Sequence, residues 1–253
     1  MVKGLAIFRD FFRDFQNQYV LIGGAACDII LSEADLSFRA TKDLDVVIVL
    51  EALTPEFGKR IWEFITEGGY KNKAKSNGTP QFYRFSEPEI NDYPYMIELF
   101  TRSEAVLDNQ EFVCRPLSIS EEISSLSAIL LNDDYYQLLS TGRVIIEDIP
   151  MLTHEYLVLF KAKAWLDLTE KRNAGHKIQS GDIKKHKNDV ANLAVLFTGS
   201  EVCEIPTTVF NDIMEFTNAF EQNPPNMKAL GITVVSIEEI VDIIRRVYIE
   251  KVG

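Results

Sequence analysis

Residues 19–34 read YVLIGGAACDIILSEA, and residues 43–50 read DLDVVIVL. The first segment begins with four apolar residues, which are typical of a short buried strand. Gly23 and Gly24 then indicate a turn, and the residues after them favour a helix by composition. The second segment is a β-branched apolar run with acids only at its start, the pattern of a central strand covered on both faces. Together the two segments predict a strand, a glycine turn, a helix and a further strand.

Helices are predicted on both sides of this unit. The first spans residues 4–16, and its apolar positions repeat with helical spacing. These positions are Leu5, Phe8, Phe12 and Phe15. The second begins after Thr54, a favourable N-cap, with Pro55 in the first helical position. It ends at the pair Gly68-Gly69.

The remaining segments complete an α+β chain with two halves. Three extended segments are predicted, two of them flanking an Asn77-Gly78 turn, and they span residues 70–76, 81–86 and 93–101. A short helix over residues 133–139 and a strand over residues 143–147 follow. Long helices then span residues 153–172, 182–198, 206–220 and 236–250. We therefore predict a mixed sheet flanked by helices in residues 1–150 and a helical half in residues 151–253.

The composition is that of an ordinary globular protein. Of the 253 residues, 46% are hydrophobic and 25% are charged. Acidic residues number 38 against 26 Lys and Arg, which gives a formal charge of −12. A surface with this charge repels phosphate backbones and anionic lipid, so a protein that coats nucleic acid is disfavoured.

The cysteines and the apolar runs bear on the cellular compartment. The three cysteines have no CxxC spacing, which disfavours a disulfide framework or a thiolate zinc site. The apolar run near the start is too short for a secretory signal, and no run approaches the roughly 18 residues of a membrane span. We expect a reduced, soluble protein of the cytoplasm with no membrane partner.

Asp43 and Asp45 are the first candidates for chemistry. They are two residues apart in a predicted strand, so both carboxylates project from the same face. Two carboxylates that close repel each other unless a cation lies between them, and hard oxygen ligands suit Mg²⁺ or Mn²⁺. The plainer interpretation of such a pair is a turn whose acids are solvated.

Two further features of the sequence could belong to the same site as Asp43 and Asp45. Gly23 and Gly24 lie between a strand and a helix, where backbone amides can approach an anion, although an ordinary turn uses the same residues. Glu98 interrupts a predicted strand over residues 95–100, and an unpaired buried carboxylate is costly. If that strand pairs beside residues 46–50, Glu98 completes a three-carboxylate site. On an edge strand it would instead face solvent.

A basic stretch over residues 161–187 contrasts with the acidic total. It contains eight Lys or Arg residues and three acids, so it carries +5 and the rest of the chain −17. Lys and Arg on long helices commonly form a solvated face, and this interpretation stays open. A local surplus of cations would also permit the binding of a triphosphate or of an RNA end.

The order of these motifs resembles the nucleotidyltransferase superfamily of the DNA polymerase beta type. The motifs concerned are Gly23-Gly24-Ala25, the run from Arg39 through Thr41 to Asp43-Leu44-Asp45, and Glu98. The chain is most similar to AbiEii-type toxin nucleotidyltransferases, because Lys163 and the run from Lys185 to Asp189 look similar to their lysine and K-x-x-x-D-like elements. The match covers residues 19 to 197. Many members have Gly-Ser where this chain has Gly-Gly, so a serine contact to phosphate is missing.

This resemblance implies a catalytic domain in residues 1–150 and a helical domain in residues 151–253 that completes the cleft. Asp43 and Asp45 would hold Mg²⁺ or Mn²⁺, and Glu98 would hold a second metal ion and help to activate the acceptor hydroxyl. The nucleotide-binding residues that it implies are Gly23, Gly24, Arg39, Thr41, Lys163, Lys185 and Asp189.

The lysines of the second half would reach the triphosphate, and Asp189 would orient Lys185 from one helical turn away. The expected reaction transfers a nucleoside monophosphate from an NTP to a hydroxyl of RNA (such as a tRNA end), of a protein or of a small molecule. The resemblance also suggests a toxin–antitoxin or phage-defence component with a cognate antitoxin as partner. Two alternatives stay open: a catalytically silent nucleotide-binding or protein-interaction module of the same fold, and a metal-dependent nuclease.

Overall fold

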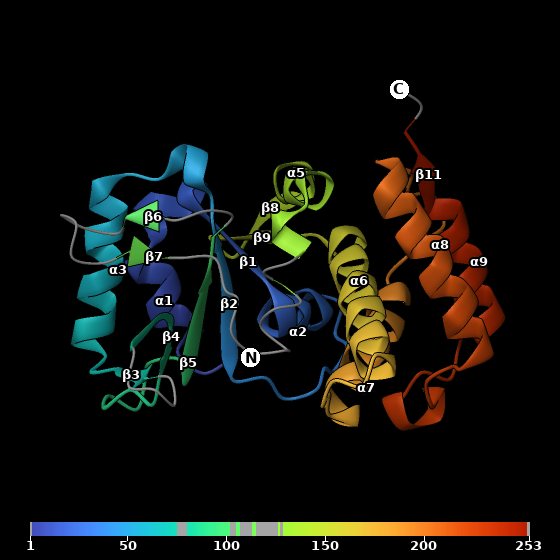
Figure 1. Cartoon of the computed structure of the whole chain (residues 1–253), viewed down its shortest axis with the longest axis horizontal. Coiled ribbons are helices and arrows are strands. Elements are labelled where there is room, and N and C mark those ends of the chain that lie inside the picture. The colour runs from blue at the N-terminus through green and yellow to red at the C-terminus, as the bar shows by residue number, and fades with distance from the viewer. Residues whose placement is uncertain are drawn as a thin grey trace. The chain divides into compact units, whose positions relative to one another are not determined.

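The chain forms two compact units (Figure 1). The structure is a computed structural model that describes residues 2–74, 80–101, 105–106, 113–114, 126 and 129–251. Unit 1 comprises Met1–Leu117 and Arg143–Leu152, and unit 2 comprises Ser118–Gly142 and Thr153–Gly253. Unit 1 contains a large mixed sheet and unit 2 is mainly helical, so the predicted α+β class and the helical C-terminal half are confirmed.

The centre of unit 1 is a seven-stranded sheet. Its strands are β1 (Tyr19–Ile22), β2 (Asp43–Ile48), β3 (Lys71–Ala74), β4 (Pro80–Ser86), β5 (Met96–Phe100), β8 (Arg143–Ile146) and β9 (Ile149–Leu152). They lie in the order β3-β4-β5-β2-β1-β9-β8. β2 is parallel to β5 and antiparallel to β1, while β1 is parallel to β9. β1 and β2 are therefore neighbours at the centre of the sheet, and all four residues of β1 are buried.

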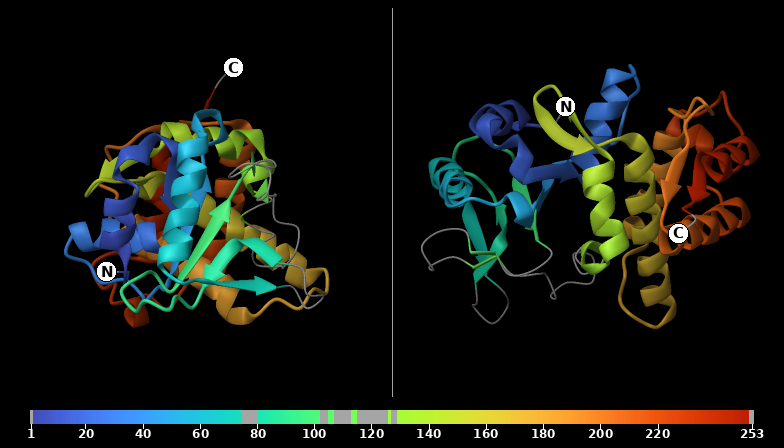
Figure 2. Two further views of the ribbon diagram at one scale, coloured as in Figure 1. Left: turned by 90° about the vertical axis from the view of Figure 1, so that its left-hand side faces the viewer. Right: turned by 90° about the horizontal axis from the view of Figure 1, so that it is seen from above.

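Two helices, α1 (Leu5–Phe11) and α3 (Pro55–Glu67), cover one face of this sheet (Figure 1). Figure 2 (left) looks onto this face, with α3 towards the viewer. α3 begins as predicted, because the Thr54 hydroxyl accepts a hydrogen bond from the Phe57 N–H at 3.3 Å and Pro55 takes the first helical position. It ends at Gly68, also as predicted.

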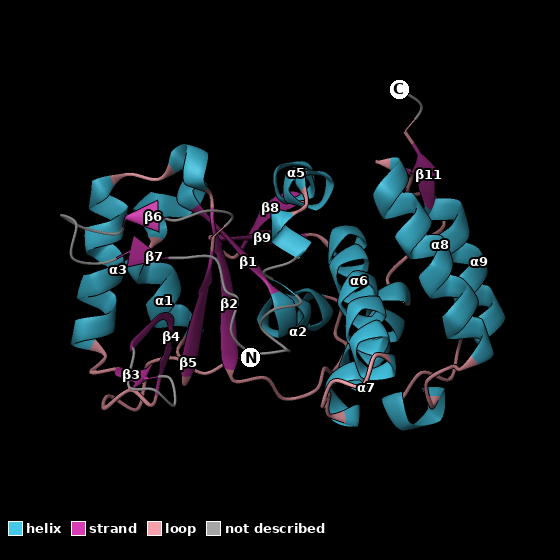
Figure 3. Ribbon diagram, viewed as in Figure 1, coloured by secondary structure: helices cyan, strands magenta, loops and turns pink. Residues whose placement is uncertain are grey.

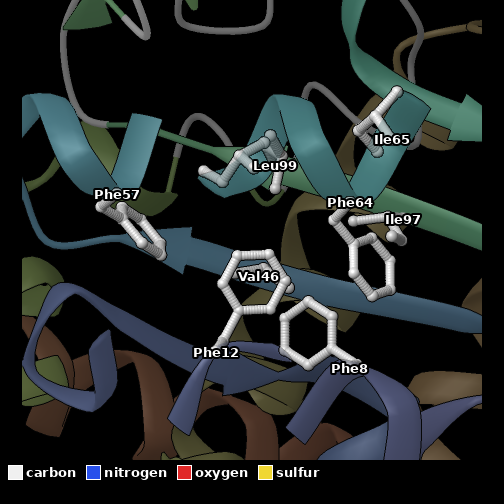
Figure 4. Close-up of a pocket in the computed structure, with 9 residues that line it drawn as sticks. Phe8, Phe12, Val46, Phe57, Phe64, Ile65, Ile97 and Leu99 are labelled. Carbon is white, nitrogen blue, oxygen red and sulfur yellow. The ribbon is translucent and has the colours of Figure 1, made fainter. Parts of the chain in front are cut away.

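An aromatic and aliphatic core fills the space between these helices and the sheet (Figure 4). Phe8 and Phe12 face Phe57 and Phe64 of α3, and Val46 of β2 lies against them. The rings of Phe8 and Phe64 meet edge to face with their centroids 5.6 Å apart, a preferred geometry for aromatic pairs. The void among these side chains is only about 10 Å³. These described side chains therefore form a closed core, and the void among them is too small for a ligand.

The opposite face is covered by α2 (Gly23–Glu33), which starts directly after β1 (Figure 1). Ala25, Ala26 and Cys27, near the start of α2, are fully buried. The thiol of Cys27 donates to the Gly23 carbonyl at 3.0 Å. Burial and this hydrogen bond make Cys27 a structural residue of the core.

The N-terminal segment departs from the prediction of one helix over residues 4–16. α1 ends at Phe11, and a 3₁₀-helix, η1 (Arg13–Gln18), follows it. Phe12 keeps its buried place although its backbone is not helical, with a φ of −107°. The apolar spacing therefore predicted correctly that Phe12 is buried. The helix does not continue through Phe12, because the chain must turn to enter β1 at Tyr19.

A β-hairpin, β8–β9, completes unit 1 on the side of β1. The sequence predicts β8, but β9 was not predicted. Its turn consists of Glu147 and Asp148, which both have positive φ, at 48° and 64°, as tight two-residue hairpins require. The turn contains neither glycine nor asparagine, the residues that usually indicate such a hairpin in a sequence. The predicted boundary near residue 150 falls inside β9.

Unit 2 is built mainly from helices (Figure 3). They are α5 (Asp133–Thr141), α6 (His154–Asn173), α7 (Ser180–Ala194), α8 (Thr207–Gln222) and α9 (Ile237–Val247). α6 packs against both α7 and α8, and α8 packs against α9. The four long helices predicted for this half are confirmed. The last one ends earlier than predicted, because Tyr248–Glu250 forms β11, which pairs in parallel with β10 (Cys203–Ile205).

Several short elements complete the description. They are η2 (Leu50–Ala52), η3 (Met227–Leu230), and the antiparallel pair β6 (Ala105–Val106) and β7 (Val113–Cys114). The predicted Asn77-Gly78 turn lies outside the described residues. Over the ranges given above, no helix combines the length and the hydropathy that a membrane span requires.

Candidate functional site

Three adjacent strands bring the predicted residues of unit 1 into one row. Asp45 of β2 is the register partner of Ile22 in β1 and of Glu98 in β5. Gly23 follows Ile22 directly and begins α2. Because neighbouring strands are about 4.8 Å apart, the glycine turn, Asp45 and Glu98 follow one another across the sheet. The condition on which Glu98 joins the acidic pair, that its strand lies beside β2, is thus met.

The carboxylates of this row lie on the face of the sheet that α2 covers. Side chains alternate along a strand, and Val46 and Ile97 point into the closed core on the other face (Figure 4). Asp43, Asp45 and Glu98 therefore project from the opposite face. For the two aspartates, this is the arrangement that their spacing of two residues predicts.

Gly23 makes the closest approach to these carboxylates. Its φ of +72° lies in the left-handed region, and a Cβ at this position would lie 1.7 Å from Oδ2 of Asp45. A side chain is therefore excluded twice, by the backbone conformation and by the space that Asp45 occupies. The glycine allows the Asp45 carboxylate to lie directly beside the first residue of α2.

A second cluster lies beside the first turn of α2. A Cβ on Gly24 would lie 2.8 Å from Oγ1 of Thr41 and 3.4 Å from Nη2 of Arg39. Among the described residues, no side chain caps α2, and its first turn contains no acid. The N-terminal amides of α2, a guanidinium and a hydroxyl are thus close together, a combination that attracts an anion such as phosphate.

Glu98 has a counterion that the sequence did not indicate. Arg84 of β4 is its register partner, and Nε of Arg84 donates to Oε1 of Glu98 at 2.5 Å. A second guanidinium nitrogen pairs with the same oxygen, and the two side chains are 25% and 11% exposed. Only the pairing of β4 with β5 places these two residues opposite each other. Nothing in the local sequence around Arg84 could have revealed this ion pair.

Asp43 and Asp45 are the residues of this row that best fit a divalent cation. Both are partly exposed and offer hard oxygen ligands from one face. Within the part of the chain that the structure describes, no group of three His, Cys, Asp or Glu side chains is arranged to hold a metal ion. The carboxylate oxygens of Asp43 and Asp45 are of the kind that Mg²⁺ or Mn²⁺ binds together with phosphate oxygens of a ligand, a usual arrangement for Mg²⁺.

The predicted lysines belong to unit 2 and have carboxylate partners there. Nζ of Lys163 lies 3.1 Å from Asp212 and 3.4 Å from Asp167. Burial alone would lower the pKa of Lys163, but the two carboxylates raise it above its ordinary value. Nζ of Lys185 lies 3.6 Å from Asp182. Within unit 2, both ammonium groups are thus partly neutralised by side chains of the same unit.

Asp189 has a partner other than the one that the sequence suggested. It is completely buried, and its Oδ2 lies 2.9 Å from Nζ of Lys161, which is 7% exposed. The spacing of four residues along α7 predicts that Asp189 orients Lys185. Lys161 belongs to α6, and its ion pair with Asp189 forms because α6 and α7 pack against each other. Helical spacing within α7 could not indicate a contact between two helices.

Comparison with known proteins does not assign the chain to a family. No family model and no curated protein sequence matches it. A functional conclusion must therefore come from the chemistry of the site itself.

Proposed function

We propose that the protein is a metal-dependent nucleotidyltransferase that moves a nucleoside monophosphate from an NTP to an acceptor hydroxyl. The observation that carries this proposal is the approach of Asp45 to Gly23. It supports a site in which a carboxylate pair suited to a cation adjoins an uncapped helix N-terminus suited to phosphate. A triphosphate with its divalent cation has both of the charges that such a site attracts.

Each residue has a distinct part in this proposal. Asp43 and Asp45 bind Mg²⁺ or Mn²⁺, which when bound supplies positive charge to the transferred phosphoryl group. Arg39, Thr41 and the backbone N–H of Gly24 bind and orient the phosphates. Positioning and charge stabilisation account for most of the catalysis of phosphoryl transfer, so the reaction needs no side-chain nucleophile.

Glu98 is the third acid of the proposed site. Its partner Arg84 holds the carboxylate in place on β5. Glu98 would hold the second cation in place of Arg84 and help to activate the acceptor hydroxyl. The acceptors that we propose are RNA, a protein or a small molecule, and a toxin–antitoxin or phage-defence setting with a cognate antitoxin is part of the same proposal.

Labelled substrates test this function directly. The protein is incubated with each α-labelled NTP, with Mg²⁺ or Mn²⁺, and with total RNA or cell lysate, and the labelled product is identified. We expect Asp43→Asn with Asp45→Asn to lower transfer by about 100-fold or more, because bound metal supplies several kcal/mol of transition-state stabilisation. Asp35→Asn is the matched control, since Asp35 is an exposed turn residue after α2. Transfer that survives the double substitution unchanged refutes the carboxylate assignment.

The Arg84–Glu98 ion pair also favours a second candidate, a catalytically silent nucleotide-binding or protein-interaction module. Arg84 already neutralises the carboxylate of Glu98, so this acid has a counterion without a metal ion. Calorimetry with each NTP and Mg²⁺, followed by product analysis, separates the two candidates. Binding without turnover across all acceptor pools supports the silent module, whereas an absence of binding removes the nucleotidyltransferase and the nucleotide-binding form of the silent module.

A further inference from the structure

A groove in unit 2 is lined by cations that the proposed site does not use. It lies among α6, the first half of α7 and the C-terminal end of α8, and its volume is about 420 Å³. The charged residues in its lining are Arg172, Lys184 and Lys187, and none of the lining residues is acidic. A volume of this size is within the range of small-molecule sites.

Lys187 is the most unusual member of this lining. Its side chain is buried, and Nζ donates to the backbone carbonyl of Asn223 at 2.7 Å. No carboxylate within the described ranges pairs with it, although a buried ammonium is costly without a counterion. Burial lowers the pKa of Lys187, and the charge of Lys184 lowers it further. The ammonium keeps two further N–H donors for a ligand.

Arg172 and Lys184 leave the rim of the groove positive. Both are exposed, and neither forms an ion pair with another described residue. The acid in the first turn of α7, Asp182, is outside the lining and pairs with Lys185 at 3.6 Å. Two unpaired cations and one buried cation therefore face a single opening.

The wall of the groove offers polar and aromatic groups as well. The hydroxyl of Thr169 is buried and has no hydrogen-bond partner among the described residues. Such an unsatisfied group costs free energy unless a ligand or water pairs with it. Trp165 forms part of the wall and is fixed by edge-to-face packing on Phe216, with the ring centroids 5.5 Å apart. A rigid wall and an unpaired hydroxyl are features of a preorganised site.

We propose that this groove binds a phosphate group, carried either by a nucleotide-sized compound or by an RNA strand. Arg172 and Lys184 contact its oxygens from the rim, and Lys187 and Thr169 donate from the wall. Charge-assisted hydrogen bonds of this kind are the strong ones for phosphate. The proposal is independent of catalysis in unit 1, because it requires neither a divalent cation nor the carboxylates of that unit.

Binding without divalent metal ions tests this site. Full-length protein in EDTA is titrated with pyrophosphate, with ATP and with a short single-stranded RNA, and Kd is measured by calorimetry. We expect wild-type protein to bind at least one probe, and Arg172→Gln with Lys184→Gln to weaken that binding about 10-fold or more. For RNA, the slope of log Kd against the logarithm of the salt concentration should also decrease by about 1.4. Each of the two lost phosphate contacts with a single strand contributes about 0.7 to this slope.

The matched control removes the same charge elsewhere. Arg13→Gln with Lys59→Gln alters two exposed residues of unit 1, whose side chains are 58% and 72% exposed, and should leave Kd within about 2-fold. Binding of RNA alone supports a strand as the ligand, and equal binding of ATP and pyrophosphate supports a free phosphate compound. Failure of every probe to bind, or an equal Kd for both double variants, overturns the proposal. Neither result depends on whether Asp43 and Asp45 support transfer.

Discussion

Gly23→Ala perturbs the contact on which the candidate site depends. With its φ of +72°, Gly23 has the left-handed backbone, and an added Cβ would lie 1.7 Å from Oδ2 and 2.6 Å from Cγ of Asp45. The backbone conformation costs about 1–2 kcal/mol for a residue with a Cβ. Forcing a methyl group against Asp45 costs about 1–3 kcal/mol more. Alanine also restricts the unfolded chain, which offsets about 0.5–1 kcal/mol. We expect unit 1 to lose about 1–4.5 kcal/mol of stability.

Urea unfolding monitored by tryptophan fluorescence measures this loss. The chain has two tryptophans, and Trp165→Phe leaves Trp62 of α3 as the reporter of unit 1. Trp62 packs edge-on against Phe85 of β4, with the ring centroids 5.6 Å apart, so its emission should change when the sheet separates from α3. The Gly23, Gly24 and Asp45 variants are all compared in this background.

Two further variants separate the causes. Gly24→Ala should cost less than about 1 kcal/mol, because its backbone is not left-handed and its closest neighbour is the rotatable hydroxyl of Thr41 at 2.8 Å. In an Asp45→Ala background, Gly23→Ala should lose its steric part, so the cycle should give a coupling of about 1–3 kcal/mol. A coupling near zero refutes the view that the Asp45 carboxylate is what excludes a side chain at Gly23.

The other predictions concern three charged groups. Arg84→Leu should lower the stability of unit 1 by about 2–3 kcal/mol, measured by urea unfolding, because it leaves Glu98 without its counterion. The double variant Arg84→Met with Glu98→Met should recover most of this lost stability. Asp189→Ala should cost unit 2 about 3–5 kcal/mol in unfolding monitored by the fluorescence of Trp165, because it leaves Lys161 buried without its counterion. The double variant Lys161→Met with Asp189→Leu removes both charges and should be clearly more stable than Asp189→Ala. Burial alone would raise the pKa of Glu201, but hydrogen bonds from Thr198 and Gly199 lower it to about 2. Its stabilising effect is therefore present above the ordinary pKa of 4.5 and is lost as the pH falls towards 2, so wild type and Glu201→Gln should differ in thermal stability at pH 7 and converge near pH 2. A difference that does not change with pH contradicts this assignment.

Local chemistry made several elements predictable. Thr54 and Pro55 define the start of α3 because an N-cap acts within three residues. The apolar run of β2 identifies a central strand, because a strand buried on both faces needs apolar side chains on both. The sequence did not predict the break in the N-terminal helix or the strand β9, because both depend on how the chain joins the sheet.

The amino-acid sequence by itself determined the local units of the candidate site: a strand that runs into a glycine turn, a helix after it, and two aspartates on one face of a strand. Only the tertiary structure decided that Asp45 lies between Gly23 and Glu98 and that Arg84 faces Glu98. It alone paired Asp189 with Lys161. The physical reason is one of range. Capping and side-chain alternation act over a few residues, whereas strand order and helix packing follow from burying whole faces against segments distant in the chain.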